Sequence, residues 1–127
     1  KNKFSSKMKN LLNESEKKTA KNKVLQINLA LNYGAKDEII NAVNKIKKSG
    51  QKFTEKNIDN NLLTSGIPVP EILIRTGNTK RLSNFLLWQI AYTEIFFEKK
   101  LWPDFKRNDF KRIINNFKNL KRNFGAI

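Results

Sequence analysis

The spacing of the hydrophobic residues alternates along this chain between the period of a helix and that of a strand. This alternation is the feature that most limits which folds the chain can adopt. Phe4, Met8, Leu11 and Leu12 recur at helical spacing, which predicts an amphipathic helix running to about Ala20. Short apolar runs follow, separated by further helix-like stretches. Helices that alternate with strands favour an α/β fold, with a mainly parallel sheet flanked by helices.

Three segments have the pattern of strands. In residues 25–31, Leu25, Ile27, Leu29 and Leu31 alternate with Gln, Asn and Ala, which is the two-residue period of a strand. Residues 71–75 (EILIR) and 95–97 (IFF) are the other two. The sequence therefore predicts a small sheet assembled from segments far apart in the chain.

The remaining apolar periodicity predicts four more helices. Each has a plausible terminal signal, such as a glycine after the last turn or a capping side chain before the first. They run from Ile39 to Gly50, from Thr54 onward, from Asn84 with Ser83 as the N-cap, and from an N-cap at Asn108 or Asp109 to Leu120.

Composition excludes several kinds of chemistry. The 127 residues contain no cysteine and no histidine. Disulfide scaffolds, thiolate nucleophiles, Ser-His-Asp triads and metal sites built from Cys or His are therefore impossible within this chain. Any reaction here must use Arg, Lys, Asp, Glu, Ser, Thr or Tyr, or a metal ion held by oxygen ligands.

The formal net charge is +15, from 26 Lys and Arg against 11 Asp and Glu. A basic nucleic-acid-binding module is one interpretation of that charge. However, 21 of the 26 cations are lysines, spread along the whole chain, whereas nucleic-acid sites favour clustered basic residues interleaved with aromatic ones. We therefore expect no nucleic-acid partner, and binding of small phosphate-bearing molecules or of anionic lipid stays an open alternative.

The most informative stretch is the predicted strand–loop–helix segment that contains Arg75, Arg81 and Ser83. Ligands of open α/β sheets bind beyond the carboxyl ends of strands, and guanidinium groups match phosphate oxygens bidentately. The segment therefore predicts a clamp for a diphosphate or carboxylate. The alternative, equally open from spacing alone, is that the two arginines form ordinary ion pairs and Ser83 only caps a helix.

Glu94 lies between Tyr92 and Phe96 in an apolar neighbourhood. A carboxylate there is costly unless it is paired or bound to a cation. With phosphates nearby it could be a magnesium ligand, and the alternative is a salt bridge to one of the arginines.

These residues also resemble a known family. The chain is similar to the cis-prenyltransferases, and within that family most closely to the bacterial enzymes that make undecaprenyl diphosphate. The resemblance spans nearly the whole chain and corresponds to the C-terminal half or more of a single-domain family member. It rests on residues 74–77 (IRTG), 81–94 (RLSNFLLWQIAYTE) and 101–105 (LWPDF), with 29–34 (LALNYG) and 122–125 (RNFG).

The resemblance implies an enzyme that adds isopentenyl diphosphate units to farnesyl diphosphate with the assistance of Mg²⁺. The product would be a long cis-polyprenyl diphosphate for cell-wall lipid carriers. By matching positions, Arg75, Arg81 and Ser83, with the backbone at Leu82, would hold isopentenyl diphosphate, and Glu94 would contribute to the magnesium site. No catalytic residue is assigned within this chain.

The resemblance also implies a homodimer in the cytoplasm, with peripheral contact to the inner face of the membrane. Residues 1–127 would then be part of one domain whose Asp-Gly-Asn segment, holding the magnesium-binding aspartate and the allylic site, lies upstream. We expect the chain alone to be inactive.

Two departures from the family pattern keep another hypothesis open. Thr79 stands where the family usually has an acidic residue, and Asn123 where it has Arg. A non-catalytic partner subunit of a heterodimeric enzyme would tolerate both changes.

Overall fold

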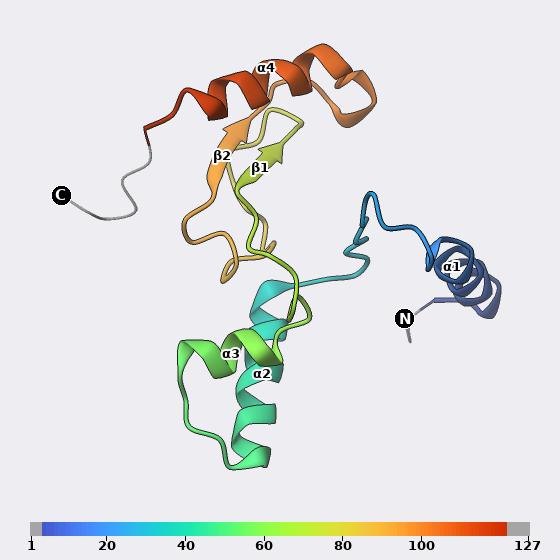
Figure 1. Cartoon of the computed structure of the whole chain (residues 1–127), viewed down its shortest axis with the longest axis vertical. Helices are drawn as coiled ribbons and strands as arrows, with labels where there is room; N and C mark the ends of the chain where they lie inside the picture. The colour runs from blue at the N-terminus through green and yellow to red at the C-terminus, as the bar shows by residue number, and fades with distance from the viewer. Residues whose placement is uncertain (1–3, 122–127) are drawn as a thin grey trace. The chain divides into compact units, whose positions relative to one another are not determined.

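The computed structural model describes residues 4–121, and the chain divides into two compact units, Lys1–Leu31 and Asn32–Ile127 (Figure 1). The first unit contains helix α1 (Ser6–Thr19). The Ser5 hydroxyl accepts a hydrogen bond from the Met8 N–H at 3.3 Å, which satisfies one of the free N–H groups at the helix start. The predicted first helix is therefore confirmed.

The strand predicted over residues 25–31 is wrong. This segment has no strand structure, and its apolar side chains are exposed, with Ile27 at 73%. A strand is stable only when its backbone groups pair with a neighbouring strand, and residues 4–31, the described part of this unit, contain no strand. Alternation alone therefore did not produce the element.

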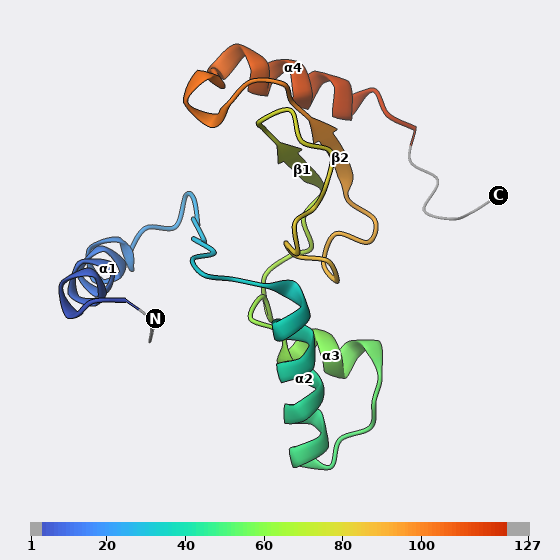
Figure 2. The same cartoon turned by 180° about the vertical axis from the view of Figure 1, so that it is seen from behind.

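The second unit begins with α2 (Ala35–Ser49), which packs against α3 (Glu55–Asn61), as both cartoon views show (Figures 1 and 2). Gly50 ends α2 with φ at +67°, a left-handed conformation that glycine adopts without steric cost. The Thr54 hydroxyl caps α3 by accepting from the Asn57 N–H at 3.2 Å. Both predicted helices are confirmed with their end signals.

The buried apolar residues of this unit lie on α2, on α4 (Arg107–Lys118) and in the segments between them. Burial of such side chains is the main favourable term in folding, so these positions define where the unit is held together. They are Ala35, Ala42 and Ile46 on α2, with Leu62, Ile90 and Ile113 from other segments.

The sheet contains two parallel strands, β1 (Ile72–Arg75) and β2 (Glu94–Phe97). Ile72 pairs with Glu94 and Arg75 with Phe97, and every residue of β1 is half-buried. An α/β fold with a parallel sheet and flanking helices is thus confirmed, with two of the three predicted strands.

The helix predicted from Asn84 is wrong. Residues 83–92 form successive turns instead, and Ser83, Asn84 and Leu86 have φ values of 50°, 62° and 45°. A left-handed residue cannot continue a right-handed helix, and each costs about 1–2 kcal/mol outside glycine. Because no helix begins there, Ser83 is not an N-cap.

The final elements are a short 3₁₀ turn, η1 (Trp102–Asp104), and α4 (Arg107–Lys118). The predicted last helix is confirmed, but its N-cap is Lys106, not Asn108 or Asp109. Asp109 lies one turn inside the helix, and its carboxylate accepts from the Lys106 backbone N–H at 2.8 Å. Among residues 4–121, no helix has both the length and the apolar character needed to cross a bilayer.

Candidate functional site

The loop that follows β1 runs beside the segment that follows β2. The Arg75 carbonyl accepts from the Glu98 N–H at 2.8 Å, and the Gly77 N–H donates to the Lys100 carbonyl at 2.7 Å. The Asn78 N–H donates to the Glu98 carbonyl at 3.1 Å. Strand pairing thus continues past Arg75 and fixes the start of the loop.

Two ion pairs connect the segment after β2 to α4. Lys100 Nζ lies 2.7 Å from an Asp109 carboxylate oxygen, and Arg112 donates to the Glu98 carboxylate. The hydrogen bond from Lys100 lowers the pKa of Asp109, and the hydrogen bond from Arg112 lowers the pKa of Glu98. The charged forms of both carboxyl groups are therefore favoured. Through these ion pairs α4 stabilises the segment that pairs with the loop after β1.

The candidate anion-binding side chains have no acidic partner among residues 4–121. Arg75 is half-buried, and its Nε is buried without a hydrogen-bond acceptor. Arg81 and Ser83 are exposed, and neither side chain pairs with another described residue. Within residues 4–121, neither arginine forms the ion pair that the alternative interpretation requires. A buried N–H without an acceptor is unusual and suits an acceptor supplied by a ligand.

Leu82 and Thr79 complete the loop. The Leu82 carbonyl accepts from the Phe85 N–H at 3.1 Å, which closes a turn directly around Ser83. The Thr79 hydroxyl donates to the Gly77 carbonyl at 3.2 Å, so this side chain folds back onto its own loop. The terminal 122–125 motif, which includes Asn123, lies outside the described residues.

Glu94 lies at a distance from Arg75 in the strand pair. It is the first residue of β2 and pairs with Ile72, three residues before Arg75. At about 3.3 Å per residue, Glu94 and Arg75 are separated by roughly 10 Å along the strands. Because successive side chains alternate between faces, Glu94 and Arg75 also lie on opposite faces of the strand pair.

Magnesium fits this arrangement only in part. No group of three or more potential Asp, Glu, His or Cys ligands occurs among residues 4–121. Mg²⁺ in proteins commonly takes one or two carboxylates and completes its shell with phosphate oxygens and water. The half-buried Glu94 could supply one such ligand, and the remaining ones would have to come from outside these residues.

The loop that contains Ser83 is fastened to the start of α2. The Asn84 carbonyl accepts from the Ala35 N–H at 2.8 Å, and Asn84 Oδ1 accepts from the Lys36 N–H at 2.9 Å. The N-cap residue of α2 is Gly34, which has no side chain to satisfy these groups. Asn84 therefore caps a helix that lies 48 residues away in sequence.

A second fastening is a buried polar cluster around Glu38, which sequence reasoning missed. Glu38 is only 5% exposed. Its carboxylate accepts from the Leu63 N–H at 2.8 Å, from Gln89 Nε2 at 3.1 Å and from the Tyr33 hydroxyl. Gln89 Nε2 also donates to the Thr64 hydroxyl at 3.0 Å. The cluster therefore joins α2, the segment after α3 and the loop before β2.

The sequence did contain a signal for this cluster. Glu38 shares the helical spacing of the buried residues Ala35, Ala42 and Ile46, which places a carboxylate on the apolar face of α2. Burial, followed by the hydrogen bond and negative charge of Glu38, raises the pKa of Tyr33 above its ordinary range. Tyr33 therefore keeps its proton and remains a donor.

Comparison with known proteins gives one family. Residues 1–125 match the family model described as "Putative undecaprenyl diphosphate synthase". The isoprenyl transferase of Aquifex pyrophilus is 44% identical over 118 residues, which are 92% of this chain and 51% of that protein. A Buchnera aphidicola relative, named as a ditrans,polycis-undecaprenyl-diphosphate synthase specific for (2E,6E)-farnesyl diphosphate, is 43% identical over 135 residues, covering 100% of this chain and 53% of that protein.

Solved structures agree. A probable undecaprenyl diphosphate synthase from Campylobacter jejuni has a TM-score of 0.86 and 40% identity, covering 98% of this chain and 59% of that one. Lavandulyl diphosphate synthase from Lavandula x intermedia, solved with dimethylallyl diphosphate, has a TM-score of 0.91 and 30% identity, covering 98% and 57%. The chain spans about half the length of the curated relatives it matches.

The Glu38 cluster predicts a titration that can be measured. In the ultraviolet difference spectrum between the wild type and Tyr33→Phe, phenolate should form at a pH clearly above the ordinary tyrosine pKa of about 10. Glu38→Gln should move that midpoint back down, because it removes the charge that opposes ionisation. A Tyr33 midpoint at the ordinary value in the wild type would contradict the buried contact.

The same shift has a consequence for stability. The folded state keeps the Tyr33 proton above pH 10 while the unfolded chain loses it, so this contribution is present below about pH 10 and is lost as the pH rises. The urea-unfolding free energy of the wild type should therefore fall more steeply above that pH than that of Tyr33→Phe.

Proposed function

Since this chain belongs to the undecaprenyl diphosphate synthase family of cis-prenyltransferases, we propose that the protein containing it condenses isopentenyl diphosphate units with farnesyl diphosphate. The product is a long-chain cis-polyprenyl diphosphate. The observation that carries the proposal is the loop after β1, where Arg75, Arg81 and Ser83 have no acidic partner among the described residues. The name of the Buchnera relative supports farnesyl diphosphate as the allylic substrate.

In this proposal the loop binds the diphosphate of isopentenyl diphosphate. Arg75 and Arg81 contribute two guanidinium groups that can each take two phosphate oxygens, and the Ser83 hydroxyl donates one more hydrogen bond. The Leu82 backbone lies between the last two of these residues. The buried, unpartnered Nε of Arg75 is the strongest support, because a diphosphate oxygen would satisfy it.

In this reaction the protein has to position the two substrates and does not have to supply a nucleophile. The allylic carbon–oxygen bond of farnesyl diphosphate breaks and diphosphate leaves. The isopentenyl double bond supplies the electrons of the new carbon–carbon bond, and the resulting cation loses a proton to regenerate an alkene. Holding the diphosphate of isopentenyl diphosphate fixes its double bond against the allylic carbon, a contribution that needs no Cys or His.

Glu94 is proposed as one ligand of Mg²⁺. The metal supplies positive charge that neutralises the leaving diphosphate. Because Glu94 and Arg75 lie on opposite faces of the strand pair, Glu94 would act on a different diphosphate group from the one in the arginine loop. Its other ligands would come from outside the described residues.

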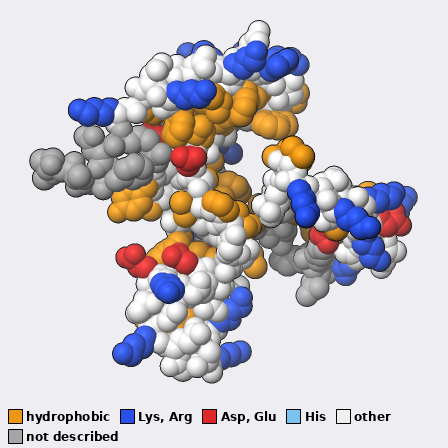
Figure 3. Space-filling view, viewed as in Figure 1, with side chains coloured by type: hydrophobic (Ala, Val, Ile, Leu, Met, Phe, Trp, Pro, Cys, Tyr) orange, Lys and Arg blue, Asp and Glu red, His pale blue; other side chains and the backbone are white. Residues whose placement is uncertain are grey.

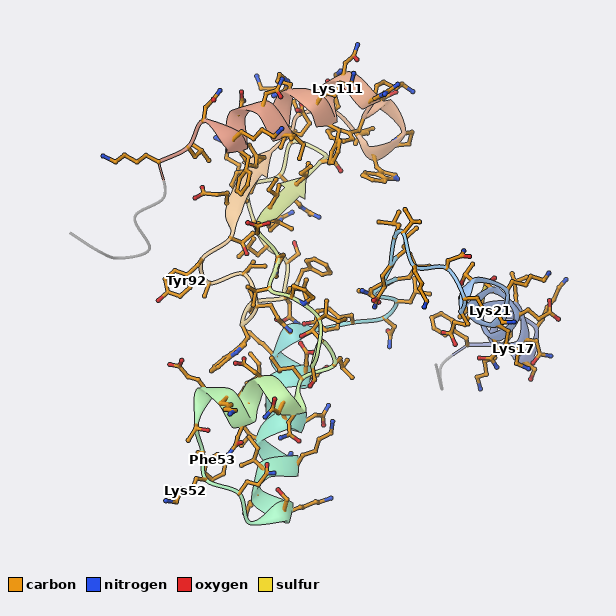
Figure 4. The ribbon with its side chains drawn as sticks, viewed as in Figure 1. Lys17, Lys21, Lys52, Phe53, Tyr92 and Lys111 are labelled. Atoms are coloured by element: carbon orange, nitrogen blue, oxygen red, sulfur yellow. The ribbon has the colours of Figure 1, made fainter. Side chains whose placement is uncertain are left out.

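We also propose a homodimer with peripheral membrane contact. Several large apolar side chains after Arg75 are exposed, and apolar surface gathers along the edge of α4 in the space-filling view (Figure 3). Tyr92, at 75% exposure, projects away from the ribbon (Figure 4). Such surface suits contact with a second copy, and a polyprenyl product suits delivery to a lipid surface. These exposed residues include Tyr92, Phe97, Leu101, Trp102 and Phe110.

The activity itself is tested with the full-length gene product, radiolabelled isopentenyl diphosphate, farnesyl diphosphate and Mg²⁺. We expect labelled long-chain polyprenyl diphosphate, separated by chain length on reversed-phase thin-layer plates. A folded protein that binds isopentenyl diphosphate but makes no product would contradict the proposal and favour the non-catalytic partner subunit suggested by Thr79 and Asn123.

Arg81→Ala should raise the KM for isopentenyl diphosphate by about 10- to 100-fold, the effect of losing a charged hydrogen bond to phosphate. The KM for farnesyl diphosphate should stay nearly constant. Lys111→Ala is the matched control, because it removes one positive charge from the outer face of α4, away from the loop (Figure 4). Equal increases for both substrates would refute the assignment of Arg81.

Glu94→Gln should abolish Mg²⁺-dependent turnover while circular dichroism and the unfolding midpoint change little. The charge is lost but the shape is kept, so a structural role would tolerate the change better than a metal ligand would. Glu71→Gln is the control, since Glu71 is an exposed glutamate whose backbone carbonyl accepts from the Glu94 N–H at 3.1 Å. A Glu94→Gln enzyme with the Mg²⁺ dependence of the wild type would show that Glu94 holds no metal.

A further inference from the structure

The turn around Ser83 has a conformation that its own sequence disfavours. Ser83, Asn84 and Leu86 all have positive φ, and none of them is glycine. Within the loop before β2, three local backbone hydrogen bonds are present, at 3.1 Å each: from the Phe85 N–H to Leu82, from the Ile90 N–H to Leu86 and from the Thr93 N–H to Ile90. A strained turn persists when its surroundings fix it, and such strain concentrates at ligand-binding loops.

The surroundings that fix it can be identified. Asn84 is joined to the first turn of α2 by two hydrogen bonds, from Ala35 and Lys36. The other fastenings lie further along the chain, where Trp88 Nε1 donates to Asp59 at 2.8 Å and Gln89 donates to Glu38. Of the residues that anchor this loop by hydrogen bonds, Asn84 is therefore the one next to Ser83, the proposed diphosphate ligand.

We propose that Asn84 is a positioning residue for isopentenyl diphosphate binding: by capping α2 it holds Ser83 and the neighbouring Leu82 backbone in the orientation that receives the diphosphate. This inference rests on the proposed function. Asn84 itself need not touch the substrate, because its carbonyl and Oδ1 are both engaged by α2.

Two properties of the site make asparagine suitable. Asparagine tolerates left-handed backbone better than most residues, which suits a φ of 62°. Its short side chain also brings an acceptor to the Lys36 N–H. The approach is close, since a Cβ added at Gly34 would lie 2.9 Å from Asn84 Nδ2. Gly34 therefore leaves the space that Asn84 occupies.

Three substitutions separate these properties. Asn84→Asp keeps both the acceptor and the tolerance of positive φ, and its charge suits a helix N-terminus. Asn84→Gly keeps the backbone freedom but removes the acceptor. Asn84→Ala removes both. The full-length protein is assayed for the KM of each substrate and for kcat, and the affinity for isopentenyl diphosphate is measured separately by titration calorimetry.

We expect the KM and the Kd for isopentenyl diphosphate to rise about fivefold or more in Asn84→Gly, further in Asn84→Ala, and little in Asn84→Asp. The KM for farnesyl diphosphate and kcat should change by less than about twofold. Gly34→Ala should weaken isopentenyl diphosphate binding in the wild type but add little in Asn84→Gly, where the crowded side chain is gone.

Thr54→Ala is the control for a merely structural effect. It also removes an N-cap hydrogen bond, at α3, so it should lower the unfolding midpoint without changing the KM for isopentenyl diphosphate. If the Asn84 variants behave like Thr54→Ala, or raise both KM values equally, the positioning role is wrong.

The binding measurement separates the two proposals. If the wild type binds isopentenyl diphosphate without forming product, the proposed activity fails while the Kd series still decides the role of Asn84. If the wild type does not bind isopentenyl diphosphate at all, both proposals fall.

Discussion

The Glu38 carboxylate imposes the strongest constraint on this structure. A buried carboxylate costs several kcal/mol unless hydrogen bonds replace its water. Glu38 lies among the apolar residues of α2 and receives its bonds from Tyr33, Leu63 and Gln89, which belong to three separate segments. Those segments must converge on it for the helix to bury its apolar face. One charged side chain on α2 thus sets the positions of the segment before the helix, the segment after α3 and the loop before β2.

The candidate site depends on this convergence because its loop has little structure of its own. Residues 83–92 contain only turns, so their path is set by what they contact. Arg75 is placed differently, by strand pairing that α4 supports through Lys100 and Arg112. The arginine loop therefore has two independently supported ends, one held by the sheet and α4 and the other by α2. In the proposed function, diphosphate binding depends on the positions of both ends, so a residue that does not touch the ligand can still affect its affinity.

Elements that depend on interactions between residues close in sequence were predicted correctly, and those that depend on distant residues were not. Local spacing and local end signals predicted several elements that the structure confirms. These are the helices around Ile46 and Ile113, the helix ends at Gly50 and Thr54, and strands β1 and β2. Residues 25–31 failed because alternation describes what a strand would bury, not whether a partner strand is present. The helix after Ser83 failed because Asn84 bonds to α2 across 48 residues and imposes positive φ. The two arginines were singled out because guanidinium groups suit phosphate, and their role stays a prediction, whereas Glu38 looked like an ordinary surface charge of an amphipathic helix.

The register of the two strands also bears on how charge is organised for the proposed reaction. Parallel pairing places Arg75 at the end of β1 and Glu94 at the start of β2, roughly 10 Å apart along the strands and on opposite faces. In the proposed reaction, Arg75 and Glu94 would therefore act on different phosphate groups, as a reaction between two diphosphate substrates requires. The separation also keeps Glu94 from neutralising Arg75, so the guanidinium stays available for an anionic ligand.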